Sequence, residues 1–245
     1  MTWMALLGAG EFEPWSEAVD RWALGRAGAD GRDGRVVIAP TASAPEGDET
    51  FEGWADKGLA HYRELDIRAE VLGLRTREDA ADPGVIGAIR EASAVYFSGG
   101  NPYYLAETLR ETPFWRALLE EMDRGTAYVG CSAGVAALTE TTYDSAVEDL
   151  RSDEVWKPGL AFVRGVLFAP HWNTVDQWFP GATEYIAASL RPGDVLVAQD
   201  EDTAMVGDGS DWSVVGEAGI HVLRDAEWSH HTAEETFRLP FRFER

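Results

Sequence analysis

"AYVGCSAGVAAL" (Ala127–Leu138) places a cysteine and a serine side by side between two glycines. The residues up to Gly130 are apolar enough for a buried strand, and those after Ser132 are good helix formers. Gly130, Ser132 and Gly134 therefore fit the pattern G-x-S-x-G at a sharp turn from strand to helix. In such a turn the central residue adopts a strained conformation that exposes its side chain, and the flanking glycines prevent clashes.

This turn assigns the nucleophile to Ser132 and not to Cys131. Ser132 occupies the central position, whereas Cys131 lies one residue earlier, where a side chain turns away from the exposed point. We interpret Cys131 as a small buried residue. Because it is the only cysteine in the sequence, it also excludes an internal disulfide and metal sites built from clustered cysteines.

Short apolar runs alternate with helical patterns along the rest of the first 138 residues. Continuous apolar strands separated by helices are typical of a parallel sheet covered on both faces. Strands are predicted at Met4–Leu7, Val36–Ala39, Ala69–Leu72, Ala94–Phe97 and Ala127–Gly130, and helices at Thr50–Leu65, Pro83–Ala92, Tyr103–Leu109 and Pro113–Arg124.

The pattern changes after Leu138. "GVLFAPHW" predicts another strand, Phe179–Leu190 predicts a helix, and the segment that follows predicts several short strands with Gly and Asp turns. We therefore expect a single α/β domain over residues 1–245. Its doubly wound, mostly parallel sheet should carry helices on both faces and a β-rich C-terminal edge.

The formal net charge of −22 limits the classes of partner. Nucleic acids and anionic lipids both require a basic surface, so neither is expected to bind. No apolar run approaches the roughly 20 residues of a membrane span, and the first residues lack the basic region of a signal peptide. A cytoplasmic location is expected, and the oligomeric state, monomer or homodimer, stays open.

A serine nucleophile needs a base, and histidine is the usual one. His171 closes the apolar run "GVLFAPH" and should project from the C-terminal end of a strand, where α/β sheets place their sites. We expect His61 to lie on the surface and His221 in a late strand. His230 and His231 form an exposed-looking pair, but no suitably spaced third ligand accompanies them, so no metal site is expected.

The remaining parts of the site are an acid for the histidine and donors for an oxyanion. Asp144 lies between the serine and the histidine in sequence, with Glu148 and Asp149 as rivals. The amide of Ala133, directly after the nucleophile, is one expected oxyanion donor. The other is expected from the glycine turn Ser98–Asn101 after the predicted strand Ala94–Phe97.

Three stretches together, "SGGN", "YVGCSAG" and "APHW", resemble the dipeptidase E and cyanophycinase family of serine peptidases. The resemblance implies the class I glutamine amidotransferase-like fold, which is flavodoxin-like, and a Ser-His-acid mechanism with no cofactor. It places the oxyanion glycine on Gly100, with Gly99 and Asn101 beside it at the substrate. It places the nucleophile on Ser132, the base on His171 and the acid, through "TTYD", on Asp144.

The specificity expected from this resemblance is altered by the stretch after His171. Relatives that cleave after an N-terminal aspartate, or cleave cyanophycin, carry basic residues there, but this chain has none before Arg191. Trp172, Trp178 and Phe179 predict an apolar wall for the substrate instead. We therefore expect small peptides with a neutral or apolar N-terminal residue, unless Arg164 or Arg191 folds into the pocket.

Four functions are compatible with these motifs. The favoured one is a serine exopeptidase or another amidohydrolase, including a cyanophycinase-like one. An α/β-hydrolase esterase shares G-x-S-x-G but usually places its histidine near the chain end. A glutamine amidotransferase needs cysteine at the centre of the turn, where this chain has Ser132. A scaffold that has lost activity is the fourth.

Overall fold

The computed structural model describes residues 2–244, and its centre is an eight-stranded mixed sheet in the order β15-β12-β11-β1-β5-β4-β2-β3. Its five parallel strands are β1 (Met4–Leu7), β5 (Ala127–Cys131), β4 (Ala94–Phe97), β2 (Arg35–Ala39) and β3 (Arg68–Val71). Beyond β1, three antiparallel strands extend it: β11 (Thr203–Gly207), β12 (Asp211–Gly216) and β15 (Thr236–Arg238).

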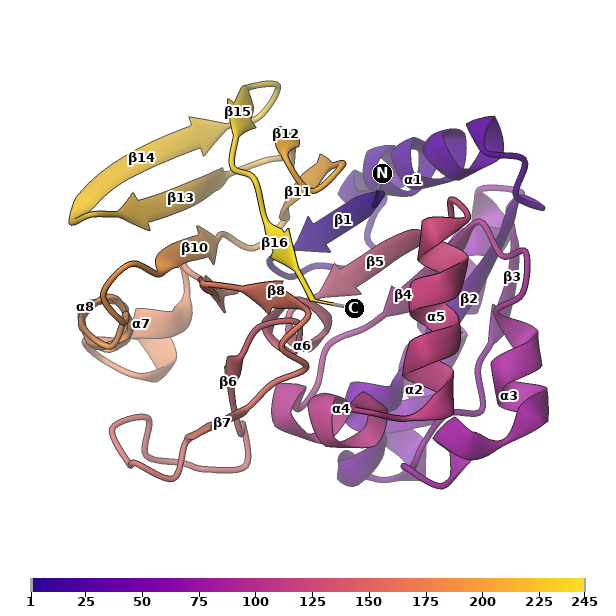
Figure 1. The fold of residues 1–245 in the computed structure, drawn as a ribbon, viewed down its shortest axis with the longest axis horizontal. Helices are drawn as coiled ribbons and strands as arrows, with labels where there is room; N and C mark the ends of the chain where they lie inside the picture. Colours follow the sequence, from indigo (N-terminus) through magenta and orange to yellow (C-terminus); the bar gives the residue numbers. More distant parts are fainter. Residues whose placement is uncertain (1, 245) are drawn as a thin grey trace.

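Helices cover both faces of the parallel part, because its strands are apolar on both sides (Figure 1). Along β1, Ala5 and Leu7 pack on one face, beneath α1 (Glu17–Ala29) and α2 (Asp48–Glu64). Met4 and Leu6 pack on the other. The elements on that second face are α3 (Pro83–Ala88), α4 (Pro102–Leu109), α5 (Pro113–Asp123) and α6 (Ala133–Ala136). The predicted α/β class, with its β-rich C-terminal edge, is confirmed.

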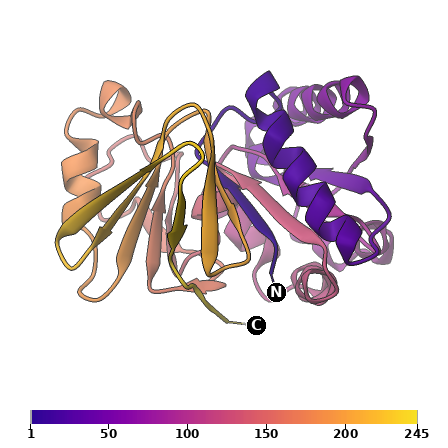
Figure 2. The ribbon, with the colours of Figure 1, turned by 90° about the horizontal axis from the view of Figure 1, so that it is seen from above.

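A second, four-stranded sheet has the order β14-β13-β10-β9. Its strands are β9 (Val166–Ala169), β10 (Val195–Gln199), β13 (Gly219–Arg224) and β14 (Glu227–Thr232), of which only β9 and β10 run parallel. Figures 1 and 2 place this sheet, with α7 (Val175–Trp178) and α8 (Ala182–Ala188), at the end of the molecule opposite α2 and α3. The strand predicted before His171 therefore belongs to a separate sheet.

The two sheets meet beside the end of β1. The Gln199 side chain, at the end of β10, donates its amide to the carbonyl of Leu6 at 3.0 Å. Gly8, directly after β1, donates its backbone amide to Thr203 at the start of β11. The chain thus leaves the second sheet at Gln199 and re-enters the first within four residues, so the ends of β1, β5 and β10 lie close together.

The remaining elements are short. Two small pairs are β6 (Thr141–Tyr143) with β7 (Trp156–Pro158), and β8 (Val163–Arg164) with β16 (Arg242–Phe243). Single 3₁₀ turns lie at η1 (Pro14–Ser16), η2 (Thr41–Glu46) and η3 (Asp79–Ala81). The helix expected at Phe179–Leu190 begins only at Ala182, because Gly181 is left-handed at its N-terminal cap. No helix within residues 2–244 has the length and apolarity to cross a membrane.

His61 is buried, so its predicted surface position is wrong. It lies on α2, and its Nε2 is 2.8 Å from a carboxylate oxygen of Asp20 on α1. The hydroxyl of Tyr62 donates to the other oxygen of Asp20 at 2.7 Å. His61 is therefore part of a buried polar link between α1 and α2.

Candidate active site

Ser132 stands at the sharp turn between β5 and α6, with φ 49° and ψ −102°. A side chain at Gly130 would come within 2.6 Å of the Gly134 carbonyl oxygen, and one at Gly134 within 2.5 Å of that of Phe97. Only glycine fits at both positions, so the strand can turn at Ser132 and hold its side chain at the edge of the sheet. The predicted turn is confirmed.

Cys131 is fully buried beneath this turn. Its thiol lies 3.0 Å from a carboxylate oxygen of Glu11, which is buried as well. Burial raises the pKa of the Cys131 thiol well above its usual range, and the Glu11 carboxylate raises it further. A buried, protonated thiol is inert as a nucleophile, as the sequence predicted for this residue.

His171 follows β9 by two residues and has a left-handed backbone, with φ 58°. Its Nε2 lies 2.8 Å from Ser132 Oγ. This distance is within the range for direct proton transfer between a nucleophile and its base. The histidine expected from the sequence therefore reaches the expected serine, although the two residues come from different sheets.

The carboxylate beside His171 is Glu201 and not Asp144. Glu201 Oε1 lies 2.7 Å from His171 Nδ1, so a chain of hydrogen bonds joins Ser132, His171 and Glu201. Asp144 instead accepts a hydrogen bond of 2.6 Å from the Asn101 side chain. Because Nδ1 is already occupied, the assignment of Asp144 as the acid is wrong in this geometry. Its exposed rivals Glu148 and Asp149 have no contact with His171 among the described residues.

A signal for Glu201 was present in the sequence. β9 and β10 are consecutive apolar strands, and polar residues follow each of them, His171 after β9 and Asp200-Glu201 after β10. In the structure the two strands run parallel, with Ala169 opposite Ala198. The carboxyl ends of parallel neighbours share one edge, so this pairing brings His171 and Glu201 together. Closeness in sequence and the stretch "TTYD" both favoured Asp144, because the pairing of the late strands was unknown.

Two backbone amides remain free beside Ser132. Within residues 2–244, neither Gly100 N nor Ala133 N donates a hydrogen bond to another protein atom. Gly100 has φ 137°, and a side chain there would come within 2.4 Å of the backbone of Ala42. The preceding amide, Gly99 N, is occupied by the Glu11 carboxylate at 2.7 Å. Free amides at these positions are what an oxyanion hole requires.

A pocket of about 240 Å³ opens beside Ser132 and His171. Its walls are mostly apolar, and they include Val147, Leu150, Val155, Trp156, Phe168, Val175, Trp178, Phe179 and Ile186. Tyr143 also lines the pocket, with its hydroxyl in contact with Ser132. Burial raises the pKa of Tyr143 to about 12, so this hydroxyl stays neutral at physiological pH.

The predicted substrate contacts are only partly present in the pocket. Gly100 lines it, and Asn101 holds Asp144 at its edge. Trp172 does not line it: its ring packs against Trp228 on β14, 5.7 Å between centroids. Trp178 lines the pocket instead. Its ring lies edge-on to the His171 ring, with 5.1 Å between the centroids, and the residue is 54% exposed. The assignment of Trp172 to the substrate is therefore wrong, because the backbone after His171 turns its side chain toward the second sheet.

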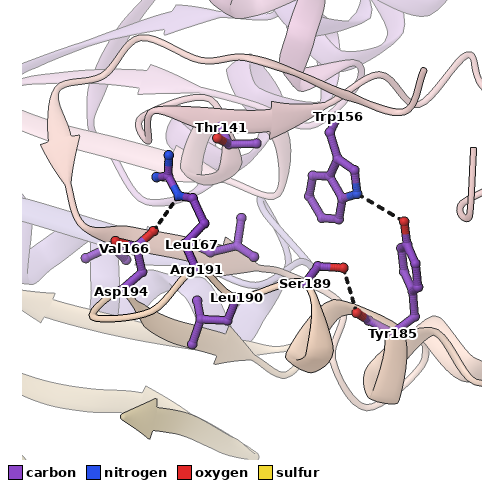
Figure 3. Close-up of a pocket in the computed structure, with 9 residues that line it drawn as sticks. All are labelled: Thr141, Trp156, Val166, Leu167, Tyr185, Ser189, Leu190, Arg191 and Asp194. Atoms are coloured by element: carbon purple, nitrogen blue, oxygen red, sulfur yellow. Dashed lines mark hydrogen bonds and ion pairs between the residues drawn. The ribbon is translucent and has the colours of Figure 1, made fainter. Parts of the chain in front are cut away.

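The two arginines that could have entered the pocket are held elsewhere. Arg191 lies in a neighbouring pocket, on the other side of Trp156, and pairs with Asp194 at 2.8 Å (Figure 3). Arg164 pairs with Glu140 and Glu244. Neither arginine lines the pocket beside Ser132, and no lysine does so in the described chain.

Residues 2–244 contain no group of three or more His, Cys, Asp or Glu side chains arranged to hold a metal ion. His230 is exposed, as expected from the sequence, and pairs with His221 at 2.7 Å between their Nδ1 atoms. His221 in turn contacts Asp200 through Nε2 at 2.9 Å. His231 stacks on Phe237 instead of joining this pair.

Known proteins with similar sequence or structure include peptidases. Residues 4–215 match the model of Peptidase family S51. The structure of a peptidase from an acI-B1 Actinobacterium superposes with a TM-score of 0.88 at 30% identity, covering 98% of this chain and 97% of its own. A putative peptidase E from Listeria monocytogenes, 20% identical, has a TM-score of 0.63 over 89% of this chain and 100% of its own. A cyanophycinase from Trichormus variabilis is 23% identical over 237 residues, which is 94% of this chain and 76% of that protein.

Proposed function

Because the chain belongs to peptidase family S51 and is a serine-type peptidase, we propose that it hydrolyses small peptides through a Ser132–His171–Glu201 triad. The observation that carries the proposal is the continuous pair of hydrogen bonds from Ser132 Oγ through the imidazole to Glu201. In this arrangement Glu201 accepts a hydrogen bond from Nδ1–H, which leaves Nε2 free to accept the proton of the serine hydroxyl.

The reaction proceeds in two halves. Ser132 Oγ attacks the carbonyl carbon of the peptide bond while His171 Nε2 takes its proton. The resulting oxyanion is bound by Gly100 N and Ala133 N, and the imidazolium is stabilised by Glu201. His171 then gives the proton to the leaving amine, the C–N bond breaks, and an acyl-enzyme forms. Water, deprotonated by His171, releases the acid and restores Ser132.

The pocket supports a neutral or apolar side chain on the residue that forms the acyl-enzyme. An aspartate there would lose water against Val147, Leu150 and Phe168, with no arginine or lysine lining the pocket to compensate. The net charge of −22 also repels an anionic substrate as it approaches. The enzyme is therefore proposed as an exopeptidase that differs from relatives specific for aspartyl peptides.

Kinetics on matched Leu-Xaa and Asp-Xaa dipeptides test this proposal, with Ser132→Ala as the inactive control. We expect kcat/KM to be at least about tenfold higher for the leucyl peptides, because burying an unpaired carboxylate is costly. Product identity is followed by mass spectrometry. A higher kcat/KM for the aspartyl peptides contradicts the proposed specificity, and hydrolysis that survives in Ser132→Ala contradicts the proposed triad.

A further inference from the structure

We propose that Asp144 binds the α-ammonium group of the substrate's first residue, while the side chain of that residue fills the apolar pocket. This assignment rests on the proposed peptidase function and makes Asp144 the residue that selects substrates with a free N-terminus. It predicts an enzyme that removes a single N-terminal residue.

Asp144 presents one bound and one free carboxylate oxygen. Its Oδ1 accepts hydrogen bonds from Asn101 Nδ2 at 2.6 Å and from the backbone amide of Ala146 at 3.0 Å. Its Oδ2 has no hydrogen-bond or ion-pair partner among the described residues, although the side chain is half-buried at the wall of the pocket. The carboxylate is therefore held in one orientation while an oxygen stays available for a ligand.

The link to Asn101 fixes Asp144 relative to the reacting carbonyl group. Asn101 Oδ1 caps α4 by accepting from the amide of Tyr104, so its Nδ2 must face Asp144. Asn101 also directly follows Gly100, the proposed oxyanion donor. In an N-terminal residue the amine nitrogen lies only about 3 Å from its own carbonyl oxygen. A carboxylate anchored one residue from the oxyanion hole is thus well placed for that amine.

The charges around the pocket favour an ammonium ligand. Among its described lining residues, Asp144 is the only carboxylate, and arginine and lysine are both missing. A bound ammonium would therefore meet an unpaired carboxylate in a partly dry site, where a charge-assisted hydrogen bond is strong. Glu201 cannot serve the same purpose through Oε1, which is occupied by His171.

The wall beyond Asp144 limits the substrate to one residue on this side. The segment from Asp144 to β7 contributes Val147, Leu150 and Val155 to the pocket. A longer chain preceding the scissile residue would replace the ammonium by a neutral amide and run into this segment. Selection of a free N-terminus and exclusion of internal peptide bonds follow from the same residues.

The test uses a matched pair of inhibitors, the boronic acid analogue of leucine with a free amine and its N-acetyl form. Each competes with a fluorophosphonate for Ser132, so affinity is measured without turnover. The proteins are wild type, Asp144→Asn, and Glu148→Gln as a control that removes a charge from the same loop outside the pocket. Asparagine keeps the acceptor for Asn101, so the loop should remain in place.

We expect the wild type and Glu148→Gln to bind the free-amine inhibitor about tenfold or more tightly than the acetylated one. Asp144→Asn should bind both about equally and retain its affinity for the acetylated inhibitor. The wild-type preference should also fall as pH rises through the pKa of the inhibitor's amine, measured separately by NMR. In Asp144→Asn this pH dependence should be absent.

The ratio of the affinities for the two inhibitors separates the titration of the inhibitor's amine from the titration of groups on the protein. The titratable or charged groups on the loop and elements around Asp144 are Tyr103, Tyr104, Glu107, Tyr143, Glu148, Asp149, Arg151, Asp153, Glu154, Lys157, His171, Asp176 and Glu201. These groups act on both inhibitors, so a merely structural role for Asp144 would change both affinities together. Equal affinities of the wild type for the two inhibitors would overturn this inference, and so would a preference for the free amine that is unchanged in Asp144→Asn. Neither result would affect the proposed function. If no protein reacts with the fluorophosphonate, the proposed function fails and the inference with it.

Discussion

Each ring nitrogen of His171 is committed to a different partner. Nδ1 faces the Glu201 carboxylate at 2.7 Å and Nε2 faces the Ser132 hydroxyl at 2.8 Å. Because a carboxylate only accepts, Nδ1 carries the proton and Nε2 is the basic atom. The residue that determines the tautomer is therefore Glu201, 30 residues away in sequence.

Replacing Glu201 by glutamine tests this role. The amide is close in size but can present its NH₂ group to Nδ1 and stabilise the wrong tautomer. We expect kcat to fall by roughly 10³–10⁴-fold with a small change in KM, as in related triads. Steady-state kinetics on a leucyl dipeptide measure the effect, with Asp149→Asn as a control on an exposed carboxylate. Retention of more than a tenth of the wild-type kcat would remove Glu201 from the triad.

Local sequence was sufficient for the residues whose geometry is local. Gly130, Ser132 and Gly134 lie within five consecutive residues and form a recognisable turn pattern, so the exposed serine could be predicted. The partners of His171 depend on which strands pair, and periodicity does not contain that information. Asp144 was assigned to the catalytic site from its place in sequence and from "TTYD", and Trp172 was assigned to the substrate from its place after His171. Both assignments failed because the arrangement of the late strands was unknown.

At the scale of elements, β9 and β10 build half of the site. Their parallel pairing brings His171 and Glu201 to one edge, and the Trp172 amide binds the Gln199 carbonyl at 2.9 Å across that edge. Glu201 N is held in turn by the Asn173 side chain at 2.9 Å. The loops after both strands are thus tied together, which keeps the histidine and its acid at a fixed distance.

The link between α1 and α2 makes a separate prediction about stability. Asp20→Ala leaves the buried side chains of His61 and Tyr62 without their acceptor. We expect the free energy of unfolding to fall by about 3 kcal/mol, since two buried polar groups lose their hydrogen bonds. Urea denaturation followed by circular dichroism gives the value. The control is Glu17→Ala, which removes an exposed ion pair with Arg21 on the same helix.

Glu17→Ala should unfold at nearly the same urea concentration as the wild type, because exposed ion pairs contribute little. If Asp20→Ala were equally stable, the buried cluster would not hold the two helices together. Activity serves as a second readout in the absence of urea. Both variants should keep the wild-type kcat, because α1 and α2 cover the sheet face away from α6.

At the scale of the whole molecule, the two sheets divide the site between them. The parallel sheet supplies Ser132 after β5 and Gly100 after β4, and the second sheet supplies His171 and Glu201. The α/β class and the five parallel strands could be predicted, because each strand is a separate apolar run. The division of the C-terminal strands between the edge of the first sheet and a second sheet could not be predicted. Strands at either place bury similar alternating sequences.

The direct test of the triad is the site of fluorophosphonate labelling, mapped by peptide mass spectrometry on wild type, Cys131→Ala and Ser132→Ala. Ser132 Oγ lies 2.8 Å from His171 Nε2 and is the proposed nucleophile, while Cys131 is buried with a raised pKa. We expect one adduct per chain, on Ser132, at similar rates in the wild type and Cys131→Ala, and none in Ser132→Ala. An adduct on any other residue, or an unlabelled Ser132 in the folded wild type, would contradict the proposed triad.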